Sequence, residues 1–168
     1  MKIPKFLLLA LACSLSFTLD TFAESVYQKA AGDAALKGDG KSAKDVLEVK
    51  PSAEAGSGNL VRVKGSVGQW DYVAYWFGLR VPAGDSILRF HIFNDGSDTA
   101  SYMIYVKDAN GQTMLGKLEI PADAPKDGFV NIDFPVKATD EWSGVIVKKA
   151  DKSDKPSPWI DTVSAVLP

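Results

Sequence analysis

The chain has 168 residues and a formal net charge of −2, from 19 lysines and arginines against 21 acidic residues. No block of basic residues interrupts this near-balance, so we expect no nucleic-acid partner, because phosphate binding needs clustered lysine and arginine. The single cysteine, Cys13, and the single histidine, His91, exclude a disulfide scaffold and the metal motifs that need paired histidines.

Residues 1–23 have the three parts of a cleavable signal peptide. Two lysines lie among the first five residues, and residues 6–19 are then apolar or small and almost uninterrupted. Thr21 and Ala23 place small side chains at the −3 and −1 positions of a cut before Glu24. We therefore expect cleavage near Ala23 and a mature protein that is secreted or lies in the periplasm or cell envelope.

Two other fates of this N-terminus stay open. The apolar run could remain as a permanent anchor, although it is short for a relaxed bilayer span. Cys13 could instead be the site of lipoprotein processing, although Ala10 stands where that processing favours a large aliphatic residue. After cleavage we expect no further membrane span, and a mature chain without cysteine must be stable on its core alone.

Residues 24–168 are long enough for a single domain with one core. The first part, residues 24–58, is rich in glycine, alanine and lysine, with one short predicted strand at 46–49 and a second following at 60–63. From residue 71 onward apolar residues recur with a period of two, and turn residues separate the runs. This pattern predicts strands at 71–81, 86–94, 101–107, 113–119, 129–136, 143–149 and 159–167. Many short strands without a helical period favour an all-β fold, an antiparallel β-sandwich.

The four-residue loop at 82–85 predicts a hairpin between the strands on either side of it. If Val81 pairs with Ser86, one register places Phe77 opposite Phe90 and buries both apolar sets together. These sets are Val73, Tyr75, Phe77, Leu79 and Val81 on the first strand, and Leu88, Phe90 and Ile92 on the second. A slip of one residue would expose one set.

The same register predicts an unusual opposite face, with Trp76 across from His91. Aromatic and cationic residues stand there in place of the usual small polar ones: Trp70, Tyr72, Trp76 and Arg80, then Arg89, His91 and Phe93. Aromatic rings stack on the apolar face of a sugar while polar neighbours bind its hydroxyl groups. The candidate ligand-binding residues are therefore Trp70, Tyr72, Trp76, Arg89 and His91.

Two other interpretations of this aromatic face stay open: another segment covers it as a second layer of core, or it contacts a protein partner. Trp142, between two predicted strands, is a further ligand-binding candidate, because an exposed tryptophan in a loop is unusual. It would equally suit the end of the sandwich as a cap. Residues 94–99 are rich in side-chain oxygens, and we interpret them as a turn in preference to a ligand site.

Three stretches resemble carbohydrate-binding modules of the galactose-binding-like jelly-roll type: SGNLV at 57–61, DYVAYWF at 71–77 and VPAGDSILRF at 81–90. They match a small-Gly-x-x-Val strand, an alternating apolar strand and a Val-Pro-Ala-Gly-x-x-x-Leu-x-Phe hairpin of those families. WIDTV at 159–163 looks like their last strand. The resemblance covers most of residues 57–167 and implies a jelly-roll that binds carbohydrate.

Several of these families also hold a structural calcium ion with two early glutamates and a late aspartate. The matching early stretch, residues 29–33, contains neither glutamate. The resemblance leaves Asp33 and Asp161 as candidate metal ligands, which are too few for a cation that takes six to eight oxygens. We expect no cofactor, with calcium as an open alternative.

The first function hypothesis is an exported, non-catalytic carbohydrate-binding domain whose partner is a glycan. We expect no enzyme, because the sequence has no Gly-x-Ser-x-Gly motif, no glycine-rich phosphate loop and no paired-histidine motif. The second hypothesis is a structural or adhesive component of the cell envelope or an extracellular assembly, which binds an envelope protein through the same fold.

Overall fold

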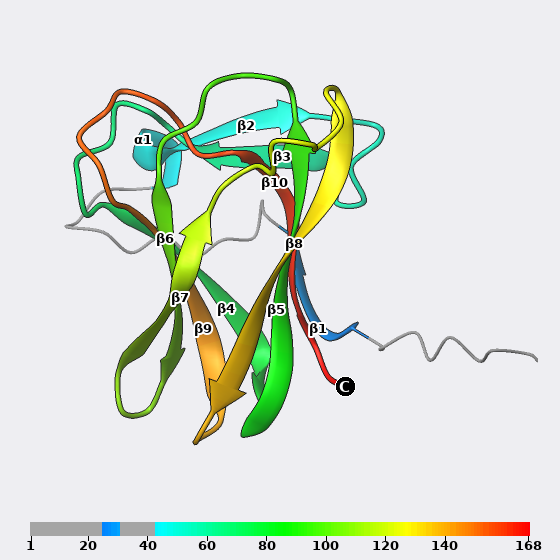
Figure 1. Ribbon diagram of the computed structural model, residues 1–168, viewed down its shortest axis with the longest axis vertical. Coiled ribbons are helices and arrows are strands. Elements are labelled where there is room, and N and C mark those ends of the chain that lie inside the picture. Colours follow the sequence, from blue (N-terminus) through cyan, green and yellow to red (C-terminus); the bar gives the residue numbers. More distant parts are fainter. Residues whose placement is uncertain (1–24, 31–42) are drawn as a thin grey trace, which may run out of the picture.

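The computed structural model describes residues 25–30 and 43–168 (Figure 1). The predicted signal peptide, Cys13 and Asp33 lie outside the described residues. Within them, strands form two antiparallel sheets that face each other as a sandwich, which confirms the predicted fold class. A single helical turn, α1 (Ala43–Val46), leads into the first of these sheets. No helix in this part of the chain is long and apolar enough to cross a membrane.

The larger sheet, sheet A, has the strand order β2-β3-β10-β5-β8, and β1 also pairs with β10. Its strands are β1 (Ser25–Ala30), β2 (Leu47–Pro51), β3 (Asn59–Val63), β5 (Gly84–Asn94), β8 (Gly128–Ala138) and β10 (Trp159–Val166). The smaller sheet, sheet B, has the order β4-β9-β6-β7. Its strands are β4 (Tyr72–Val81), β6 (Tyr102–Asp108), β7 (Gln112–Leu118) and β9 (Trp142–Lys149).

The nine strands predicted from apolar alternation are all present, with ends that differ by a few residues. β1 was not predicted, because its six residues, SVYQKA, show no clear apolar alternation. It pairs with the last strand, from Ser25 opposite Val166 to Ala30 opposite Thr162. The beginning and the end of the domain are therefore joined within sheet A, as Figure 1 shows for β1 and β10.

The predicted hairpin between residues 71–81 and 86–94 is wrong. β4 pairs with β9 in sheet B, whereas β5 pairs with β10 and β8 in sheet A, so the intervening turn carries the chain from one sheet to the other. Both apolar sets still face the interior, and their buried members are Val73, Tyr75, Phe77, Val81, Leu88, Phe90 and Ile92. Alternation identifies the buried side of each strand. It does not distinguish two strands that pair within one sheet from two strands that face each other across the core, because the same side is buried in both cases.

Leu79 departs from its set and is 67% exposed. Regular pairing of β4 with β9 breaks between Trp76 and Val81, so the strand bulges where Leu79 lies. Elsewhere the core is closed by edge-on aromatic contacts. Phe77 meets Trp142 with ring centroids 5.7 Å apart, and the equivalent contact within sheet A joins the rings of β5 and β8 at 5.8 Å.

Candidate functional site

The structure divides the predicted ligand-binding residues between the two outer surfaces of the sandwich. Those on sheet B or at its end are Trp70, Tyr72 and Trp76, and those on sheet A are Arg89 and His91. Trp76 pairs with Gly144 of β9 and is not opposite His91, as the hairpin register had predicted. The candidate site must therefore be sought on each face separately.

The outer face of sheet B is built by alternation along β4, β9 and β6. Residues of these strands that are not directed into the core lie in three cross-strand rows: Tyr72, Lys148 and Met103; Ala74, Ile146 and Tyr105; and Trp76, Gly144 and Lys107. Trp70 lies just before β4, next to the first row. We call the surface formed by Trp70, Tyr72, Trp76, Tyr105, Lys107 and Lys148 the platform.

Two of the three residues in the middle row of this face, Ala74 and Ile146, are apolar and buried. Ala74 and Ile146 are only 1% and 4% exposed although they point away from the core of the sandwich. Tyr72 and Trp76, on either side of Ala74 along β4, are partly exposed. The platform is therefore an aromatic surface on a small apolar base, intermediate between an open face and a second core.

Trp76 owes its position to a glycine on the neighbouring strand. A Cβ atom added at Gly144 would lie 2.7 Å from Cζ3 and 3.1 Å from Cη2 of the Trp76 ring. Glycine in the interior of a strand lowers stability and often marks a place where another group approaches closely. Here the group is the indole, which crosses β9 toward Lys107 of β6, whose Nζ lies 5.4 Å from the ring centroid.

Trp70 is 54% exposed and stands in a left-handed backbone conformation, with φ of 77°. A non-glycine residue pays a strain energy there, and such residues cluster at functional sites. Its amide donates a hydrogen bond to the carbonyl oxygen of Lys149 at 2.9 Å. The ammonium of Lys148 lies 5.3 Å from the Trp70 ring centroid. Both tryptophans of the platform thus have a lysine over the ring.

The loop that carries Trp70 is fixed by a buried lysine. Lys149 is 1% exposed, and its Nζ donates to the carbonyl oxygens of Gly65 at 2.6 Å and Val67 at 3.2 Å. One residue further along the loop, the amide of Gly68 donates to Oδ2 of Asp71 at 2.8 Å. These bonds hold residues 65–71 against the end of β9, so the exposed tryptophan rests on a rigid support.

A pocket of about 140 Å³ is lined by Trp76 and by four charged residues: Arg80, Lys107, Asp108 and Glu141. Its two acids already have partners. Asp108 accepts hydrogen bonds from the amides of Asn110 and Gly111, and Glu141 forms an ion pair with Arg80 at 3.5 Å. The arrangement supplies stacking surfaces and cations, without a free pair of carboxyl groups of the kind that glycoside hydrolysis uses.

On the outer face of sheet A, Arg89 and His91 are engaged with acidic partners. Arg89 makes a two-bond ion pair with Asp133, with both N–O distances 2.7 Å. Nδ1 of His91 lies 3.0 Å from Oδ2 of Asp161, and the imidazole stacks on Phe129 at 4.7 Å. These two residues therefore hold sheet A together and lie on the opposite side of the molecule from the platform.

Asp161 is buried and anchors the loop between β2 and β3. Its Oδ1 accepts hydrogen bonds from the amide and hydroxyl of Ser57, and its Oδ2 from the amide of Gly56. Burial alone would raise the pKa of Asp161, but these bonds and His91 outweigh it and hold the pKa below its ordinary value. Among residues 25–30 and 43–168, no group of three or more acidic, histidine or cysteine side chains could hold a metal ion.

Trp142 does not lie in an exposed loop, which was one of the two positions that the sequence left open for it. Trp142 opens β9 and is 1% exposed, in edge contact with Phe77 in the core. The loop ends one residue earlier than predicted. Regular alternation would place this indole on the outer face with Gly144, but the pairing of β9 with both of its neighbours shifts register between Trp142 and Gly144, and the indole lies in the core. Trp159 is also buried, with its indole N–H donating to Asp95 and the Arg62 guanidinium 4.2 Å above its ring.

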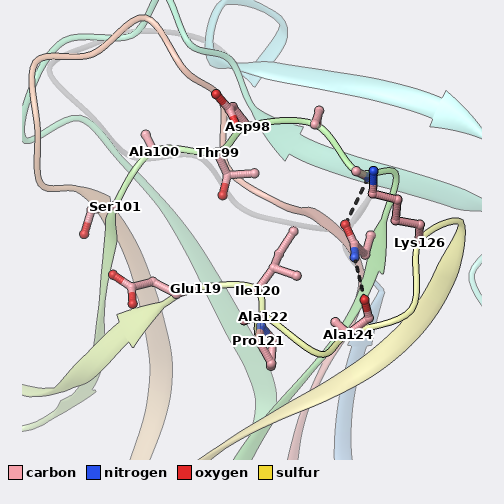
Figure 2. A pocket seen from close by; sticks show the side chains of 13 residues that line it. Asp98, Thr99, Ala100, Ser101, Glu119, Ile120, Pro121, Ala122, Ala124 and Lys126 are labelled. Carbon is pink, nitrogen blue, oxygen red and sulfur yellow. Dashed lines mark hydrogen bonds between the residues drawn. The ribbon is translucent and has the colours of Figure 1, made fainter.

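A larger cavity of about 690 Å³ lies between the loop after β5 and the loop after β7 (Figure 2). No aromatic side chain is among the described residues that line it. Asn94 bridges the two loops: its Nδ2 donates to the carbonyl oxygens of Ala124 and Pro125, and its Oδ1 accepts from the amide of Gly96. The last bond closes a turn over residues 94–96, within the segment interpreted from its sequence as a turn.

Sequence reasoning missed the residues that β6 and β9 add to the platform, Tyr105, Lys107 and Lys148, and the glycine that supports Trp76, Gly144. Alternation in residues 101–107 already set Met103, Tyr105 and Lys107 apart from the apolar Ile104 and Val106. What the sequence did not supply was the strand order, which makes β9 the neighbour of both β4 and β6. The glycine in the interior of β9 was the one local signal of close approach.

No protein-family model and no curated protein matches this sequence. Solved structures with a similar fold include carbohydrate-binding modules. A β-1,3-glucan-binding family 6 module from Bacillus halodurans has a TM-score of 0.57 at 13% identity, covering 83% of this chain and 95% of that one. A family 6 module from Clostridium cellulolyticum, in complex with xylose, gives 0.55 at 13% identity, covering 83% and 96%.

A third module, from Cellvibrio mixtus lichenase 5A in complex with cellotriose, gives a TM-score of 0.53 at 14% identity, covering 86% of this chain and 99% of that one. At identities this low, the structural similarity establishes the fold alone. The matches span nearly the whole of each module. The resemblance seen in the sequence is confirmed at that level: the chain has the galactose-binding-like jelly-roll fold of carbohydrate-binding modules.

Proposed function

We propose that this protein is an exported, non-catalytic domain that binds a glycan chain on the platform, through Trp70, Tyr72 and Trp76. The observation that carries the proposal is a pair of partly exposed indole rings on one face, each held in place. One rests against Gly144, and the other stands in a strained conformation on a clamped loop. An apolar sugar face stacks on such rings, while nearby polar groups reach its hydroxyls.

The length of the platform favours a chain of sugars over a single one. Trp76 shares a row with Gly144 and Tyr72 shares a row with Lys148, and these partners are four residues apart on β9. Four residues of strand span roughly 13 Å. Trp70 extends the surface beyond the Tyr72 row, so an oligosaccharide could lie across both tryptophans at once.

The two acidic residues near Trp76, Asp108 and Glu141, favour binding over hydrolysis, because each already interacts with another group of the protein. Asp108 is held by two backbone amides and Glu141 by Arg80, so both carboxylates already carry interactions. The export part of the proposal rests on residues 1–23 of the sequence. The jelly-roll fold shared with glycan-binding modules supports the binding part.

A titration against a glycan panel tests this proposal. The mature protein, Trp76→Ala, Trp70→Ala and the control Leu79→Ala would each be titrated by calorimetry with oligosaccharides of laminarin, xylan, cellulose and polygalacturonate. Leu79 is a suitable control because it is an exposed apolar residue on the same strand, outside the platform. We expect Trp76→Ala to abolish binding of whichever glycan the native protein takes, and Leu79→Ala to leave it unchanged.

Each variant would also be checked by circular dichroism and thermal melting. The platform rings are partly exposed, so their removal should cost less stability than emptying a core site, where Phe or Trp to Ala costs about 3–5 kcal/mol. Glycan binding that survives both tryptophan variants would place the site elsewhere. Absence of binding to every glycan would refute the proposal.

A protein partner is the second candidate function. Met114 of β7 is 55% exposed and pairs with Tyr105, so the apolar surface continues past the tryptophans to the edge of sheet B. A glycan that stacks on the tryptophans has no need of this extension, whereas a broad protein contact would use it. Met114→Ala would weaken the binding of a protein partner and leave glycan binding unchanged.

A further inference from the structure

The charges of the protein are distributed unequally between its two sheets. The strands of sheet B contain five basic residues, Arg80, Lys107, Lys117, Lys148 and Lys149, and one acidic residue, Asp108. By contrast, the six strands of sheet A contain five basic residues (Lys29, Lys50, Arg62, Arg89, Lys137) and four acidic ones (Glu48, Asp85, Asp133, Asp161). Sheet B is thus locally basic in a chain whose formal net charge is −2.

Two of these basic side chains lie on the platform without an acidic partner. Lys107 and Lys148 form no ion pair with any residue of the described chain, whereas Arg80 pairs with Glu141 and Lys117 lies 4.0 Å from a glutamate. Lys149 is buried against backbone carbonyls. The two unpaired ammonium groups are those that lie over the rings of Trp76 and Trp70.

This placement has a consequence for any sugar that stacks on the platform. A sugar that stacks on the same ring face takes the place of the ammonium group over the indole, which breaks a favourable cation–π contact. A neutral sugar offers the displaced lysine only hydroxyl groups. A sugar with a carboxylate or sulfate offers it an ion pair, in a charge-assisted hydrogen bond that is stronger than a neutral one.

We propose that the glycan bound by the platform is acidic, with carboxylate or sulfate groups on its sugar rings, and that Lys107 and Lys148 select for it. This inference rests on the proposed function, because it concerns the ligand of the same surface. The lysines lie in the two outer rows of the platform, one beside each tryptophan. A stacked chain would therefore meet one cation near each end.

The test uses two pairs of ligands that share a backbone and differ in charge: polygalacturonate oligomers with their methyl esters, and κ-carrageenan oligomers with their desulfated forms. Binding to the mature protein would be measured by calorimetry at low and high salt. The variants are the double substitution Lys107→Gln with Lys148→Gln, and the control Lys137→Gln, an exposed lysine of sheet A.

We expect one acidic ligand to bind at least tenfold more tightly than its neutral form. This ratio should fall toward one in the double lysine variant and in high salt, because salt screens exposed charges, and it should persist in Lys137→Gln. A neutral form that binds as tightly as its acidic counterpart, or a ratio that survives the double substitution, would overturn the inference.

The outcome also separates this inference from the proposed function. Binding of the neutral forms, or of laminarin and xylan, that is lost in Trp76→Ala would leave the platform as a glycan site and remove only the preference for acidic sugars. If none of these acidic or neutral glycans binds, both proposals fail together.

Discussion

Gly144 is the residue on which the shape of the platform depends most directly. It allows the ring of Trp76 to cross β9, because any larger residue would bring a Cβ atom to 2.7 Å from that ring. Alanine in the interior of a strand is ordinarily more stable than glycine by about 0.5–1 kcal/mol. The contact with Trp76 is therefore a reason for a glycine at a position where the backbone does not require one.

We predict that Gly144→Ala loses this ordinary gain in stability and weakens glycan binding by roughly tenfold or more, because the Trp76 ring must move. Gly78→Ala is the matched control: Gly78 lies on β4, and an added Cβ there would meet no atom within 4 Å. Calorimetric titration and thermal melting of both variants measure the two effects. Equal affinities in Gly144→Ala and Gly78→Ala would show that Trp76 does not depend on the glycine.

At the scale of elements, the loop of residues 65–71 lies between β3 of sheet A and β4 of sheet B and carries Trp70 of the platform. Lys149 supports it from inside, while its neighbour Lys148 points outward over Trp70. Adjacent positions on one strand thus serve opposite sides of the sheet. The buried ammonium donates to two backbone carbonyl oxygens, and leaving buried polar groups unsatisfied costs about 1–3 kcal/mol.

We predict that Lys149→Met lowers the free energy of unfolding by about 2–3 kcal/mol and speeds hydrogen exchange at the amides of Gly68 and Trp70. Lys148→Met should change stability by no more than about 0.5 kcal/mol, as exposed substitutions usually do. Denaturant unfolding and exchange mass spectrometry would compare them. Similar losses of stability in the two variants would contradict the buried clamp.

The strands could be predicted from the sequence because each carries its own alternation, whereas their partners could not. For Phe77 and Phe90 the sequence correctly indicated the buried side, and the short loop between their strands then favoured a hairpin that does not form. The same error separated Trp76 from its true neighbours and gave it His91 in their place. The burial of Trp142 could not be predicted from alternation, because the register of β9 shifts between Trp142 and Gly144 and reverses the side that regular alternation gives.

At the scale of the whole molecule, the sandwich has two unlike outer faces. On sheet A, charged and aromatic side chains pair with one another, as Arg89 does with Asp133 and His91 with Asp161. On sheet B, the rings of Trp70 and Trp76 and the lysines over them have no acidic partner among the described residues. The second face therefore presents partly exposed rings to a ligand, with a lysine over each of its two tryptophans.

The four tryptophans of the chain report on these surfaces separately. Trp70 and Trp76 belong to the platform, Trp142 is in the core between the sheets, and Trp159 is buried on sheet A beneath Arg62. Each indole N–H gives its own signal in a nitrogen–proton correlation spectrum of the labelled protein. Single substitutions of the tryptophans would assign the four signals.

The most direct test of the platform is to follow these four signals while the glycan that binds most tightly is added. We predict that the signals of Trp70 and Trp76 shift with the same dissociation constant, while those of Trp142 and Trp159 stay in place. Movement of the Trp159 signal with Trp70 and Trp76 unmoved would put the ligand on sheet A and contradict the account.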